Sequence, residues 1–346
     1  MNSTIPRYRR SFHETIRPIK GIGGPPGSED SVSPISSSSL PTAEPIQVLK
    51  EYFGLDKFRP MQEQIIKNAI AKKDSLVIMP TGGGKSLCYQ VPALVYSSGV
   101  TIVISPLIAL MQDQVSALLL HNIAADYISS SRPTSENQKV CRTLRDSDTL
   151  RLLYVAPERL GSEGFSELLQ KLYRAGRLNL FAIDEAHCLS QYGHDFRPDY
   201  RKLDCLRKRF ATVPIMALTA TATPDVQKDI LDQLRISAAP VYLSSFNRPN
   251  LFYRVTPRSD EIFYQKIQEF TGKSIIIYDT TRKSVERLAK ALCDRGYRAV
   301  AYHAGMTGEQ RTTAQSQFIN DEALIIVATI SYGMGIDKLL VNIFDY

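Results

Sequence analysis

Short, predominantly apolar runs recur along the chain, and between them apolar residues repeat every three or four positions. As far as residue 219, the runs lie at 76–79, 100–105, 152–156, 181–184 and 215–219. Strands that are apolar on both faces and alternate with helices are typical of a parallel sheet with right-handed crossovers and helices on both sides. The pattern therefore predicts an α/β fold built on a doubly wound parallel sheet.

The same alternation begins again after residue 244. Strands are expected at 275–278, 298–302 and 324–328, and helices at 283–295 and 309–320. Proline and asparagine interrupt the pattern at residues 240–249, where we place a hinge. We expect a first domain at 45–242 and a second at 243–346. Two such domains enclose a cleft, in which a ligand on the first can be touched by the second.

The first residues of the chain follow neither pattern. Residues 1–44 are rich in serine, proline and glycine and have little apolar periodicity. Such a segment cannot bury enough apolar surface to offset the entropy lost on ordering. We expect it to be disordered, and a plain flexible leader is favoured over a targeting or docking role.

Composition narrows the class of protein. No apolar run approaches the roughly 18 residues that span a bilayer, and no apolar stretch follows the basic residues at the N-terminus, which excludes a secretory signal. We expect a soluble intracellular protein with no membrane partner. The five cysteines are scattered without a C-x-x-C pair, so neither a zinc site nor a disulfide framework is indicated. The formal net charge of +7 suits a polyanionic partner.

A glycine-rich stretch lies between the run at 76–79 and the next helical segment. It reads Pro80, Thr81, Gly82, Gly83, Gly84, Lys85 and Ser86. Glycines adopt the positive φ angles that turn backbone N–H groups toward a phosphate, and a helix N-terminus adds its dipole. Lys85 is expected to reach the β- and γ-phosphates and Ser86 to bind Mg²⁺. Met79 stands where the strict motif has glycine, so this stretch alone is also compatible with an ordinary turn.

Two adjacent acids follow the run at 181–183. Asp184, at the carboxyl end of its strand, is placed to hold Mg²⁺, and Glu185 can polarise the attacking water. Together with the glycine-rich stretch, these acids predict a site for a nucleoside triphosphate.

Further polar residues stand where strands are expected to end. Ser105, Pro106, Thr219 and Thr221 are of this kind and suit contact with a phosphate backbone. A capped helix start explains each of them equally well when it is taken alone. The amide of Gln62 could read an adenine edge, although by itself Gln62 is an ordinary surface residue.

Several motifs occur in one order along the chain. They are FRPMQ at 58–62, the segment 79–90, SPLIALMQDQV at 105–115, DEAHC at 184–188, LSQYGHDFRPDY at 189–200, the segment 217–223, YHAGM at 302–306 and GMGIDK at 333–338. In this order and spacing, from about residue 49 to 338, the chain resembles a RecQ-type DNA helicase of helicase superfamily 2. The stretch at 189–200 resembles the aromatic-rich loop that separates RecQ enzymes from the rest of that superfamily.

This resemblance implies two RecA-like domains that use ATP and Mg²⁺ to move 3′ to 5′ along single-stranded DNA and to unwind duplex DNA in repair and recombination. It implies that Arg59 and Gln62 recognise adenine and that Gly335 and Asp337 belong to the nucleotide site. The residues implied in catalysis are Lys85, Asp184, Glu185 and His187. Those implied in DNA binding or in its coupling to ATP are Ser105, Pro106, Tyr192, His194, Arg197, Thr219 and Thr221. Without the motif beside it, Tyr192 would be interpreted as a buried core residue.

The sequence departs from the family pattern at several points. Tyr192 replaces the usual tryptophan, Leu55 an aromatic residue, Asp279 a small residue or cysteine, and Leu339 a proline. The chain stops before the family's Gln-x-x-Gly-Arg-x-Gly-Arg motif, so we expect an incomplete, poorly ordered second domain and slow ATP hydrolysis without unwinding. A catalytically weak or silent ATP- and DNA-binding fragment, and an RNA helicase of the DEAD or DEAH type, are the alternatives. The leader favours a eukaryotic nuclear protein over a bacterial cytoplasmic one, and protein partners are not indicated.

Overall fold

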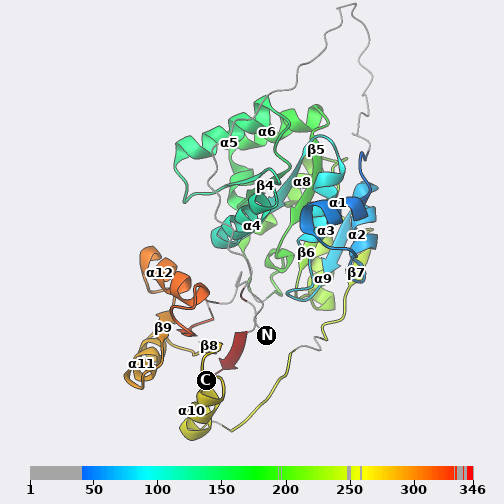
Figure 1. Ribbon diagram of the computed structural model, residues 1–346. Helices are drawn as coiled ribbons and strands as arrows, with labels where there is room; N and C mark the ends of the chain where they lie inside the picture. The colour runs from blue at the N-terminus through cyan, green and yellow to red at the C-terminus, as the bar shows by residue number, and fades with distance from the viewer. Residues whose placement is uncertain are drawn as a thin grey trace, which may run out of the picture. The chain divides into compact units, whose positions relative to one another are not determined.

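The computed structural model describes residues 41–193, 195, 197–247, 251–257, 259–330, 332, 338 and 341–345. Most of the predicted leader lies outside these residues, as do His194, Gly335 and Asp337 of the expected site. Within the described residues the chain folds into two α/β domains, each with its own sheet (Figure 1).

The first domain contains a parallel sheet. Its strands stand in the order β3-β4-β2-β5-β6-β1-β7, and every pairing between them is parallel. The strands are β1 (Ser75–Ile78), β2 (Val100–Ile104), β3 (Ala125–Ile128), β4 (Leu152–Val155), β5 (Leu178–Ile183), β6 (Ile215–Thr219) and β7 (Val241–Leu243).

Helices cover both faces of this sheet, because successive strand residues point to opposite sides. Leu76 and Ile78 pack in a core with α5, α6, α8 and α9, whereas Val77 and Met79 pack with α2, α3 and α4. The helices are α1 (Pro45–Phe53), α2 (Gln62–Ile70), α3 (Leu87–Val95), α4 (Ile108–Leu120), α5 (Thr134–Asp146), α6 (Glu163–Arg174), α7 (Pro198–Arg201), α8 (Asp204–Arg209) and α9 (Pro224–Leu234), with 3₁₀ turns η1 (Pro157–Gly161) and η2 (Ala186–Leu189). The predicted doubly wound sheet is confirmed.

The second domain repeats this architecture on a smaller scale. Its strands β8 (Ser274–Tyr278), β9 (Ala299–Tyr302), β10 (Ile325–Ala328) and β11 (Val341–Asp345) are parallel, in the order β11-β8-β10-β9. Helices α10 (Asp260–Glu269) and α11 (Arg282–Asp294) pack on one face, and α12 (Gly308–Ile319) packs on the other. The second α/β unit predicted from the sequence is therefore present.

Three edge strands were not predicted from the apolar pattern. Strand β3 is only partly buried and carries Asp126 within it, so its sequence is not an apolar run. Strand β7 lies inside the predicted hinge range, where its residues Val241 and Leu243 are exposed. Strand β11 pairs with β8 along its whole length. Among the described helices, none is both long and apolar enough to pass through a bilayer.

Candidate active site

The expected site residues gather at one edge of the first sheet. Strands β2, β5, β6 and β1 are neighbours in that order, with Ile104 opposite Ile183 and Ile78 opposite Thr219. Because the strands are parallel, the loops after them leave from the same edge. These loops are residues 79–86, 105–107, 184–190 and 220–223.

The loop between β1 and α3 has the geometry expected of a phosphate-binding loop. Gly82 and Gly84 have φ angles of 75° and 85°, which favour glycine. A Cβ on Gly83 would lie 2.8 Å from the Pro80 carbonyl oxygen, so a side chain is excluded there. Lys85 Nζ donates to the Met79 carbonyl at 3.1 Å. The Met79 side chain is buried in the core, which explains why a large residue is tolerated at a position where the strict motif has glycine.

Arg59 and Gln62 are bound to this loop. The Gln62 amide is buried, accepts from the Arg59 backbone N–H at 2.8 Å and donates to the Gly84 carbonyl at 3.0 Å. The Arg59 guanidinium donates to the Gly82 carbonyl. Gln62 is thus not an ordinary surface residue. The structure places both residues expected to recognise adenine against the glycine-rich loop.

The two acids after β5 occupy a constrained turn. Glu185 has a φ angle of 49°, a left-handed conformation that is strained for a residue with a side chain. Its backbone N–H donates to Asp184 Oδ1 at 3.0 Å. Burial raises the pKa of Asp184, and the positive charge of Lys85 partly offsets this. Burial, and after it the charge of Asp184, raise the pKa of Glu185 to about 7. A cation at this turn would favour the ionised form of both carboxyl groups.

A chain of contacts leads from Glu185 to the surface. His187 Nδ1 lies 3.3 Å from Glu185 Oε2 and 2.8 Å from Thr219 Oγ1. The Thr219 hydroxyl donates to the Thr221 carbonyl at 3.0 Å and accepts from the Thr221 N–H at 3.2 Å. Thr219 is fully buried and Thr221 is exposed. Thr219 therefore connects His187 to Thr221 and does not itself reach the surface.

The aromatic-rich loop presents Tyr192 to solvent. Tyr192 is 76% exposed, so its interpretation as a core residue is wrong. Arg197, at the end of the loop, donates to the Pro106 carbonyl and to Asp195 Oδ2, each at 3.0 Å. Two residues expected to contact DNA, Arg197 and Pro106, are therefore bound to each other.

Helix capping differs between Ser105 and Thr223, the last residue of the segment 217–223. Ser105 Oγ is buried and has no hydrogen-bond partner among the described residues, and α4 has no side-chain cap. Capping therefore does not explain Ser105. Thr223 does cap a helix, because its hydroxyl accepts from the Val226 N–H at the start of α9.

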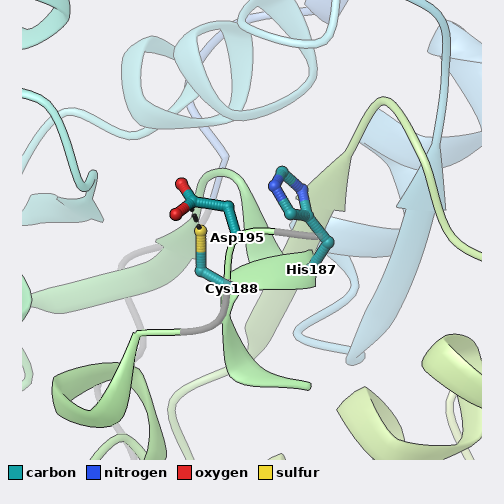
Figure 2. Close-up of side chains that lie close together, drawn as sticks. All are labelled: His187, Cys188 and Asp195. Atoms are coloured by element: carbon teal, nitrogen blue, oxygen red, sulfur yellow. Dashed lines mark hydrogen bonds between the residues drawn. The ribbon is translucent and has the colours of Figure 1, made fainter. Parts of the chain in front are cut away.

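His187, Cys188 and Asp195 offer possible metal ligands within 4.8 Å of one another. Figure 2 shows the Asp195 carboxylate facing the Cys188 thiol, with the His187 ring beside this pair. Burial, followed by the charge of Asp195, raises the pKa of Cys188 to about 12, which favours the thiol over the metal-binding thiolate. Asp195 is paired with Arg197 and His187 with Thr219, so these side chains are already held by neighbouring protein groups.

Two family models match the chain. The model described as DEAD/DEAH box helicase covers residues 59–230, and the helicase conserved C-terminal domain covers residues 259–344. The ATP-dependent DNA helicase RecQ of Pasteurella multocida is 45% identical over 316 residues, which are 90% of this chain and 49% of that protein. The ATP-dependent DNA helicase Q1 of Rattus norvegicus is 44% identical over 301 residues, which are 84% of this chain and 48% of that protein.

A solved structure shares the fold. The Mycobacterium smegmatis helicase Lhr, bound to single-stranded DNA and AMP-PNP, superposes with a TM-score of 0.64 at 19% identity, over 88% of this chain and 44% of that one. The chain spans about half the length of the curated relatives that it matches.

Proposed function

Because the chain belongs to the RecQ family of DEAD/DEAH-box helicases, we propose that it carries the ATP-driven motor of a DNA helicase. The motor moves 3′ to 5′ on single-stranded DNA and unwinds duplex DNA in repair and recombination. One observation carries the proposal most directly. The contacts from Glu185 through His187 and Thr219 to Thr221 link the acidic turn to an exposed loop at the same edge as Tyr192.

The residues of the first domain fit ATP and Mg²⁺. The N–H groups of the loop from Thr81 to Gly84 would surround phosphate, and Lys85 would contact the β- and γ-phosphates. The Ser86 hydroxyl and the Asp184 carboxylate are hard oxygen ligands of the kind that Mg²⁺ prefers, and a cation there would counteract the burial that raises the pKa of Asp184. When bound, Mg²⁺ would neutralise negative charge on the phosphates. Glu185 would accept the proton of the attacking water. Gly335 and Asp337 are proposed to complete the nucleotide site from the second domain.

Gln62 and Arg59 are proposed to recognise adenine and, through their hydrogen bonds to loop carbonyls, to couple adenine binding to the glycine-rich loop. We expect Gln62→Ala to raise the KM for ATP about 10-fold, because the partly buried Gly84 carbonyl loses the amide that donates to it and the loop loses a tether. A fluorescent ATP analogue and the ratio of ATP to GTP turnover measure the effect. Asn68→Ala is the matched control, since the Asn68 amide also bonds backbone carbonyls but at the far end of α2. An equal change in KM in both variants would assign Gln62 a purely structural role.

The DNA-facing residues are proposed to be Tyr192, His194 and Thr221, with Arg197 and Pro106 fixing the loop beside them. Ser105 is buried and is therefore not proposed to face DNA directly. We expect Tyr192→Ala to raise the concentration of single-stranded DNA that half-saturates ATP turnover at least about 5-fold, because one stacked base is worth about 1–3 kcal/mol. Tyr192→Phe keeps the ring, so its half-saturating DNA concentration should stay within about 2-fold of the parental value. DNA stimulation that does not change in Tyr192→Ala would remove Tyr192 from the DNA site.

A single comparison tests the proposed function. ATP turnover is measured with single-stranded DNA, with RNA of the same sequence and with neither, and unwinding is measured on duplexes with a 3′ or a 5′ tail. Stimulation by DNA and preference for the 3′ tail support the proposal. Stimulation by RNA would favour an RNA helicase, and ATP binding without turnover would favour a silent fragment. The nuclear location stays a prediction, because the relatives include bacterial and mammalian proteins.

A further inference from the structure

Tyr200 connects the aromatic-rich loop to the acidic turn. It is the last residue of the aromatic-rich stretch 189–200, lies in α7, and has a fully buried side chain. Its hydroxyl donates to the Asp184 carbonyl oxygen at 3.0 Å. The loop is bound to the same motif a second time, because the Arg197 N–H donates to the Cys188 carbonyl at 3.0 Å.

The bond made by Tyr200 falls on the peptide that sets the direction of Glu185. That peptide's N–H, which belongs to Glu185, donates to Asp184 Oδ1 at 3.0 Å, and its carbonyl, which belongs to Asp184, accepts from Tyr200. Both ends of the peptide plane are therefore fixed. Since Glu185 holds a strained left-handed φ of 49°, it needs such support to stay in place. A tyrosine hydroxyl keeps its proton at neutral pH, so the Tyr200 hydroxyl remains a donor.

We propose that Tyr200 is a positioning residue through which DNA bound at the aromatic-rich loop sets the orientation of Glu185 for ATP hydrolysis. This inference rests on the proposed function. A shift of the loop moves α7, and the Tyr200 hydroxyl passes that shift to the peptide between Asp184 and Glu185. The alternative is a purely structural role, in which Tyr200 only packs in the core with Leu203 and Leu206.

The test replaces Tyr200 with phenylalanine, which keeps the ring and removes only the hydroxyl. Tyr96→Phe is the matched control. Tyr96 is also buried and donates to a backbone carbonyl, that of Ile70 at 2.9 Å, but it lies at the end of α3 opposite the glycine-rich loop. We expect Tyr200→Phe to lower the DNA-stimulated kcat about 3- to 10-fold, more than the DNA-free rate, with little change in the KM for ATP. Tyr96→Phe should behave as the parent.

Each outcome has a defined meaning. If the parent is not stimulated by DNA, the proposed function fails. The proposed coupling through the Tyr200 hydroxyl is wrong if DNA stimulates ATP turnover equally in the parent and in Tyr200→Phe. It is also wrong if Tyr200→Phe and Tyr96→Phe lose the same fraction of the stimulated turnover. An equal loss of the DNA-free and the DNA-stimulated rates in Tyr200→Phe also contradicts the proposal. The hydroxyl would then support Glu185 without coupling DNA binding to ATP hydrolysis.

Hydrogen exchange in the unmodified protein gives a second measurement that does not depend on how the variant folds. Addition of single-stranded DNA should slow exchange at residues 184–188 and 199–203 together. If exchange at residues 184–188 does not respond to DNA, the proposal is contradicted.

Discussion

Replacing Lys85 with alanine is expected to lower ATP turnover at least about 100-fold and to weaken ATP binding. The reason is electrostatic, because in the proposed site Lys85 supplies the positive charge that faces the developing charge on the β- and γ-phosphates. Its charge also lowers the pKa of Asp184 and Glu185, so its loss should make both acids harder to ionise. Turnover with saturating single-stranded DNA and titration with a fluorescent ATP analogue measure the two effects.

A surface lysine provides the control for this experiment. Lys67 lies on α2, is exposed and pairs with Glu63. Such exposed pairs contribute little to stability, so ATP turnover and ATP affinity in Lys67→Ala should stay within about 2-fold of the parental values. Parent-like turnover in Lys85→Ala would mean that the glycine-rich loop is not the catalytic phosphate site.

Replacing Glu185 with glutamine is expected to stop turnover while ATP still binds. Glutamine has nearly the same shape but cannot accept a proton from water, so a loss of at least about 100-fold is expected. Glu167→Gln, at an exposed position on α6, controls for the loss of a carboxylate elsewhere in the domain. Hydrolysis at the parental rate in Glu185→Gln would remove Glu185 from the water-activating role.

The same variant should be more stable than the parent in the absence of Mg²⁺. Burial, followed by the charge of Asp184, raises the pKa of Glu185 from 4.5 to about 7, so the folded parent loses stability as pH rises toward and through 7. Glutamine does not ionise and avoids this loss. The difference in Tm between Glu185→Gln and the parent should therefore be small near pH 4.5 and grow between pH 5 and pH 8. A constant difference across this range would contradict the cause assigned to the pKa shift.

The sequence predicted the parts of the site that depend on local chain geometry. Predominantly apolar runs marked the central strands β1, β2, β5 and β6, since a strand covered on both faces is apolar along most of its length. Glycines at 82 and 84 signalled positive φ angles, which depend on the residue itself. Edge strands β3 and β7 escaped prediction because they are only partly covered.

Only the tertiary structure decided which of the polar residues act on one another. Gln62 and Arg59 are bound to loop carbonyls more than 20 residues away, and Arg197 is bound to Pro106 across 91 positions. The sequence placed Tyr200 at the end of the aromatic-rich stretch, but did not indicate that its hydroxyl reaches Asp184. Such contacts depend on which strands are neighbours in the sheet, and strand order arises from packing of the whole domain. The residue types alone thus determined the chemistry available to this protein, whereas the fold determined which groups are close enough to use it.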